Sequence, residues 1–156
     1  MILGGTDDTR FELEVVGYQF PHMEHDEYGY DANWLNIRLS VRCPGNAWTT
    51  IDPCLFTWEV ARLARWFEAI AADSTVEFEE IFTEPTVRFA LIEANPKALR
   101  VYFWPGWAPS DGASTDDVYI ECNASSEALR TAAASLRAQL QQFPIRAGAD
   151  ESWGRR

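Results

Sequence analysis

The chain has 156 residues, 47% of them hydrophobic and 13% aromatic, and 13 Lys and Arg against 24 Asp and Glu give it a formal net charge of −11. This length and apolar content predict one domain with a sizeable buried core and exclude a disordered chain. The charge argues against nucleic acid, anionic membranes and phosphate-rich ligands as partners, because these attract Lys and Arg, and it is compatible both with a basic protein partner and with simple solubility.

The first half of the chain predicts three strands, whose alternating apolar and polar side chains indicate one buried face. They cover residues 10–20, 34–41 and 47–51. Residues 1–9 form a polar lead-in, and Gly17 interrupts the alternation of the first strand, as a bulge does. A polar, acidic loop over residues 21–31 separates the first two strands, and Pro44 with Gly45 predicts a type II turn between the second and the third.

Residues 57–72 give the clearest helix pattern in the chain, with strands predicted on both sides of it. Its apolar side chains recur at helical spacing and define one stripe: Val60, Leu63, Ala64, Phe67, Ile70 and Ala71. Arg62, Arg65 and Glu68 lie off this stripe, so the helix should be half buried. Thr57 is placed to cap the first turn with its hydroxyl.

The second half of the chain predicts four more strands and a second helix. The strands cover residues 76–83, 86–94, 99–103 and 118–122. A long loop over residues 105–117 precedes the last strand. The second helix runs over residues 125–143, begins with a cap at Ser125 or Ser126 and is ended by Pro144. Its apolar stripe consists of Leu129, Ala133, Leu136, Leu140 and Phe143.

Short turns between the strands favour antiparallel pairing, since parallel strands need long crossovers. The predicted fold class is therefore α+β, with a single, mostly antiparallel, meandering sheet of about seven strands and two amphipathic helices packed on it. Residues 1–144 should form one domain. Residues 145–156 should form a flexible C-terminal tail, in which Trp153 either docks or hangs free.

The cysteines Cys43, Cys54 and Cys122 are odd in number and show no CxxC spacing. Their apolar or strand-forming neighbours predict buried, reduced thiols, which favours a cytoplasmic location. The N-terminus has neither the basic part nor the long apolar part of a signal peptide, and no apolar run reaches the roughly 18 residues of a membrane span.

Catalytic motifs are absent from the sequence: it contains no GxSxG, HExxH, Walker A or GxGxxG pattern in a suitable context. His22 and His25 lie in the acidic loop, so a metal-dependent hydrolase is one alternative, although their spacing fits no established ligand frame. Cys54 could act as a nucleophile near a helix N-terminus, but its apolar neighbours favour a buried structural thiol. Glu79 and Glu80 should point to opposite faces of a strand. No enzyme, cofactor or metal site is predicted.

Aromatic and charged side chains are predicted to line the sheet face that points away from the core. They are Trp34, Arg38, Arg100, Tyr102, Trp104, Tyr119 and Glu121. Trp, Tyr and Arg are enriched at binding hot spots, so Trp34, Arg38, Tyr102, Trp104, Tyr119 and Glu121 are the candidate partner-binding residues. Alternatively, the second helix, a long loop or a symmetric partner covers this face.

Five segments resemble bacterial WapI-type immunity proteins: Phe11–Pro21, Tyr30–Leu35, Asp52–Glu59, Phe82–Leu91 and Leu129–Leu140. The resemblance extends over most of the chain. It implies a protein that protects a cell by stoichiometric, non-catalytic binding of a toxin domain, often a nuclease. The family pattern contains no catalytic residues that could be carried over to this chain.

Together, these observations predict a cytoplasmic binding protein, a monomer or a homodimer, that masks a basic toxin domain. Two alternatives remain open: a small metal-dependent hydrolase that uses His22 and His25, and a homo-oligomeric protein with a structural role.

Overall fold

The computed structural model describes residues 1–5, 7–107 and 118–146, and its strands form two four-stranded sheets. The N-terminal sheet has the order β1 (Ile2–Gly4), β2 (Arg10–Tyr18), β3 (Trp34–Cys43) and β4 (Asn46–Phe56). The C-terminal sheet has the order β5 (Glu79–Ile81), β6 (Val87–Ala94), β7 (Lys97–Phe103) and β8 (Val118–Asn123). All six strand pairs are antiparallel.

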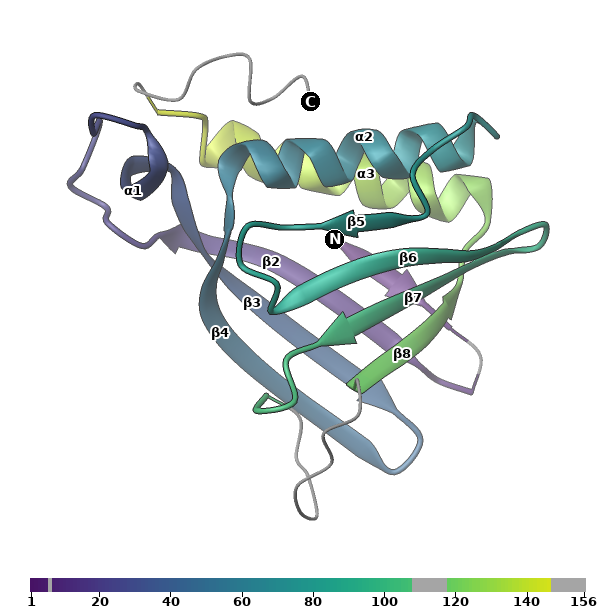
Figure 1. The fold of residues 1–156 in the computed structure, drawn as a ribbon. Helices are drawn as coiled ribbons and strands as arrows, with labels where there is room; N and C mark the ends of the chain where they lie inside the picture. Colours follow the sequence, from purple (N-terminus) through teal and green to yellow (C-terminus); the bar gives the residue numbers. More distant parts are fainter. Residues whose placement is uncertain (6, 108–117, 147–156) are drawn as a thin grey trace.

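Three helices complete the described part of the fold: α1 (Tyr30–Asn33), α2 (Thr57–Ala71) and α3 (Ser126–Gln142). The two sheets lie one in front of the other, and α2 and α3 run side by side along the top of both (Figure 1). None of these helices is long and apolar enough to cross a membrane.

The predicted α+β class and antiparallel pairing are confirmed, but the single sheet of seven strands and two helices is wrong. Alternation along a strand shows that one face is buried, and it does not show what buries it. Here α2 follows β4 and the chain then starts a second sheet, so the apolar faces of the two sheets cover each other. The additional strand, which the sequence did not predict, is β1, and it lies in the predicted polar lead-in. Leu3 is buried there, and the amino group of Met1 donates to the carbonyl of Leu13 at 2.7 Å.

Aromatic rings join the two sheets and α2 in one core. The ring centroid of Phe89 on β6 lies 5.8 Å from that of Phe11 on β2 and 5.7 Å from that of Phe67 on α2. All six residues of the predicted α2 stripe are buried, and the α3 stripe packs on the same core through Leu129 and Leu136. Helix packing is therefore the part of the fold that the apolar periodicity predicted best.

The beginning of α2 differs from the prediction, because Phe56 and not Thr57 occupies the N-cap position. The hydroxyl of Thr57 donates instead to Oδ1 of Asn33 at 2.9 Å. The carboxylate of Glu59, at the third helical position, accepts the backbone N–H of Phe56 at 3.0 Å, which is the contact that the acidic residue of a capping box makes with the N-cap amide. At α3, the cap is Ser125, one of the two predicted serines, and its hydroxyl accepts the backbone N–H of Ala128.

Local features of the strands agree with the sequence. The pairing of β2 with β3 shifts register between Val15 and Gly17, which confirms the bulge, and Gly45 has the positive φ that its turn requires. Most of the predicted loop 105–117 lies outside the described residues. So does most of the predicted tail, including Trp153.

Candidate partner interface

The outer face of the C-terminal sheet is where aromatic and charged side chains gather. Strand register places Arg88, Tyr102 and Tyr119 in one row across β6, β7 and β8, and Arg100 next to Glu121 in the neighbouring row. We call these five residues, with Glu79 and Ile81 of β5 and Trp104 just after β7, the aromatic face.

Cation–π contacts hold the centre of the aromatic face. The guanidinium carbon of Arg88 lies 3.8 Å from the ring centroid of Tyr102, and that of Arg100 lies 4.2 Å from the centroid of Tyr119. The two tyrosine rings are themselves 5.6 Å apart between centroids. Such pairs favour defined ring positions, so the face is pre-organised.

Carboxylates balance both arginines. Arg88 pairs with Glu79 at 3.0 Å, and Nη2 of Arg100 pairs with Glu121 at 2.5 Å. The hydrogen bonds to Glu121 and then to the hydroxyl of Tyr102 raise the pKa of Arg100 above its usual value. Two arginines and two glutamates leave the aromatic face with no net charge.

Apolar exposure is concentrated at the C-terminal sheet. Trp104, Ile81 and Tyr119 expose 57%, 52% and 47% of their surfaces, and Phe78 and Ile92 at the same sheet are also exposed. The outer face of the N-terminal sheet exposes only Ile2 and Ile51 among large apolar side chains of the described residues. Exposed aromatic groups with rigid arginines are typical of binding hot spots.

The six predicted partner-binding residues do not share one surface. Tyr102, Trp104, Tyr119 and Glu121 belong to the aromatic face. Arg38 lies on the outer face of the N-terminal sheet, where it pairs with Glu14 at 2.5 Å, and Trp34 on the same strand stacks at a tilt against Phe56. The split follows from the two-sheet fold, because the outer faces of two sheets that cover each other point in opposite directions.

Arg88, Glu79 and Ile81 are residues of the aromatic face that the sequence prediction missed. They alternate outward on β5 and β6, but their place beside Tyr102 depends on strand order, which the sequence does not reveal. The prediction that Glu79 and Glu80 point to opposite faces is confirmed, since Glu79 is exposed and Glu80 is buried.

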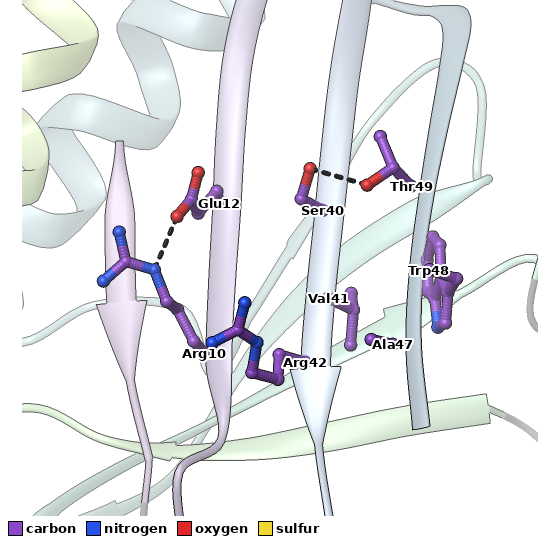
Figure 2. A pocket seen from close by; sticks show the side chains of 8 residues that line it. All are labelled: Arg10, Glu12, Ser40, Val41, Arg42, Ala47, Trp48 and Thr49. Atoms are coloured by element: carbon purple, nitrogen blue, oxygen red, sulfur yellow. Dashed lines mark hydrogen bonds and ion pairs between the residues drawn. The ribbon is translucent and has the colours of Figure 1, made fainter. Parts of the chain in front are cut away.

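The outer face of the N-terminal sheet carries an open pocket with a different lining (Figure 2). Arg10 pairs with Glu12 at 2.5 Å, the hydroxyl of Thr49 donates to that of Ser40 at 3.0 Å, and Arg42 extends into the same opening. Most of these groups are polar and satisfied by one another, which is ordinary for a solvated sheet face. This pocket is therefore a weaker candidate than the aromatic face.

The acidic loop contains the two histidines of the chain and several carboxylates. Within the described ranges, which include the whole loop, no group of three or more His, Cys, Asp or Glu side chains is placed to hold an ion. Asp26 instead accepts the backbone N–H groups of Ala32 at 2.7 Å and Tyr28 at 3.0 Å. Burial acts to raise the pKa of Asp26, and hydrogen bonds from four backbone N–H groups outweigh it and lower that pKa.

Burial of Cys54 and Cys122 makes them unsuited to act as nucleophiles. Cys54 and Cys122 are buried as predicted, whereas Cys43 is half-buried. Burial, with a smaller contribution from Asp52, raises the pKa of the Cys54 thiol to about 12, and burial alone raises that of Cys122 to about 12. Both thiols are therefore protonated and unreactive at neutral pH.

Comparison with protein-family models gives one match, over residues 1–144, to a family described as the immunity protein WapI-like family. No curated protein and no solved structure matches the chain.

Proposed function

This chain belongs to the WapI-like immunity protein family, and we propose that it neutralises a cognate toxin domain by binding it stoichiometrically, without catalysis. The family match carries this proposal. The net charge of −11 supports a basic toxin domain, for which a nuclease is the natural class because its own substrate is polyanionic. Binding and masking take place in the cytoplasm in this account.

The proposed contact surface is the aromatic face. Tyr102, Trp104 and Tyr119 supply large, rigid apolar groups, and Glu121 supplies an acceptor at its rim. Because Arg88 and Arg100 already hold the tyrosine rings in place, little side-chain entropy is lost when a partner docks. Trp34 and Arg38 lie on the opposite side of the molecule and are left outside this surface.

Co-expression tests the function. The chain is produced with the polypeptide that the adjacent reading frame encodes, and growth and co-purification are measured. We expect rescue of growth and an equimolar complex. If no neighbouring frame encodes a toxin, or if the neighbour is toxic and neither binds nor is neutralised, the proposal is wrong.

Substitution tests the surface. Tyr119→Ala should weaken the complex more than tenfold, because truncation of a hot-spot residue costs about 2 kcal/mol or more. Ile51→Ala is the matched control, since Ile51 is similarly exposed, at 54% against 47% for Tyr119, on the other sheet and should leave affinity unchanged. Equal affinities of the two variants would place the interface elsewhere.

A further inference from the structure

A groove lies at one end of the molecule, in the segment that leads from β2 to α1. It is lined by Gln19, Phe20, Pro21, His22, Met23, Glu24 and His25. Phe20 exposes 38% of its surface, and with Pro21 and Met23 it gives the groove a largely apolar lining. We call this feature the loop groove. It is distinct from the aromatic face, which belongs to the other sheet.

Arg146, from the far end of the chain, holds the loop groove in shape. Its guanidinium donates to three backbone carbonyls within residues 20–23, at 3.0 Å to that of Phe20, 3.0 Å to that of Pro21 and 2.7 Å to that of Met23. Its backbone N–H donates to Oδ1 of the buried Asn33 at 2.8 Å. The guanidinium carbon of Arg146 also lies 3.4 Å from the ring centroid of Tyr18. The backbone of the loop groove is therefore pre-organised.

The segment around the loop groove is strongly acidic. Residues 19–31 contain Glu24, Asp26, Glu27 and Asp31 and no Lys or Arg, which gives a formal charge of −4 with both histidines neutral. The guanidinium of Arg146, which lies against this segment, reduces that charge to −3. Glu24 lines the groove itself, and Glu27 and Asp31 are exposed. An apolar groove with an acidic rim complements an apolar side chain that has cations on either side of it.

We propose that the loop groove receives a segment of the toxin domain in which an apolar side chain is flanked by Lys or Arg. This inference rests on the proposed function and assigns different kinetic roles to the loop groove and the aromatic face. Because the aromatic face has no net charge and the loop segment is acidic, the loop carries the charges nearest to the bound segment and contributes to the attraction that speeds association. The aromatic face sets the dissociation rate.

The test measures association and dissociation rates of the full chain with the toxin domain by stopped flow, at low and high salt. Glu24→Gln combined with Glu27→Gln should slow association several-fold at low salt, converge with wild type at high salt, and change dissociation less than twofold. Glu127→Gln is the control, because it removes one negative charge from α3, away from the loop, where the double variant removes two from the loop. Unchanged association rates in the double variant, with the complex intact, overturn the inference and leave the proposed function standing.

A second measurement does not depend on the toxin. The probe is a synthetic peptide with one Trp between two Arg residues, and the readout is the methyl NMR signal of Met23, one of only two methionines in the chain. We expect this signal to shift on titration with wild type and much less with the Glu24→Gln, Glu27→Gln variant. No shift with wild type, or equal shifts with both, overturns the loop groove as a site for cationic segments. Failure of the toxin complex alone would count against the proposed function.

Discussion

Replacement of Glu59 by Ala is predicted to destabilise the protein although no catalytic role is involved. Glu59 exposes 1% of its surface and accepts three hydrogen bonds, from the backbone N–H of Phe56 at 3.0 Å, the backbone N–H of Thr83 at 2.7 Å and the hydroxyl of Thr83 at 2.8 Å. It thereby ties the first turn of α2 to the segment after β5.

The cost can be worked from these contacts. Thr83 is exposed and its donors can turn to water, but Phe56 is buried, so its N–H would lose its partner at about 1–3 kcal/mol. Exchange of the two hydrogen bonds from Thr83 for water adds about 1 kcal/mol. Relief of the buried carboxylate's desolvation offsets part of this sum, and we expect a net loss of about 2–3 kcal/mol in the free energy of unfolding.

Urea unfolding followed by tryptophan fluorescence measures this loss. The control is Glu68→Ala on the same helix, whose partner Arg137 forms an exposed ion pair at 2.6 Å, and it should cost less than about 1 kcal/mol. If Glu59→Ala lowers the free energy of unfolding no more than the control does, the hydrogen bonds of Glu59 do not stabilise the start of α2 as proposed.

Three other predictions follow from single groups. Burial raises the pKa of the Glu80 carboxyl above its ordinary value of 4.5, so the folded protein binds a proton there more tightly than the unfolded chain. The free energy of unfolding, measured relative to Glu80→Gln, should therefore fall as pH rises from 4.5 through the raised pKa. Parallel pH profiles of urea unfolding for the two proteins would contradict this. Arg146→Ala should speed hydrogen exchange in residues 19–25, with no change in the C-terminal sheet as the internal control. A thiol reagent should titrate Cys43 but not Cys54 or Cys122 until the protein unfolds; three fast thiols in the native state would contradict the burial.

Helix α2 was predictable because its apolar stripe is long and regular. The helical spacing of its apolar residues alone identifies the six side chains that are buried. Strand β1 was not predictable, because its three residues, Ile2, Leu3 and Gly4, are too few to show an alternation of apolar and polar side chains. The division into two sheets was also hidden. Alternation marks the buried face of each strand, and the choice between one sheet and two depends on contacts such as that of Phe11 with Phe89, which are distant in sequence.

The candidate site was predictable only in part for the same reason. The outward positions of Tyr102 and Tyr119 follow from alternation within their own strands. The arginine that stacks on Tyr102 comes from β6 and is identified only by register. Arg146 gives no local signal at all, because its contacts with the loop groove join residues more than 120 positions apart.

The central claim is that the chain neutralises its toxin by occupying it in a fixed ratio. Titration of the purified toxin domain's activity with the purified chain tests this most directly. We expect a linear loss of activity that reaches zero at one molar equivalent, together with a stable equimolar complex. Complete inactivation by a small fraction of an equivalent, or undiminished activity in excess chain, would contradict it.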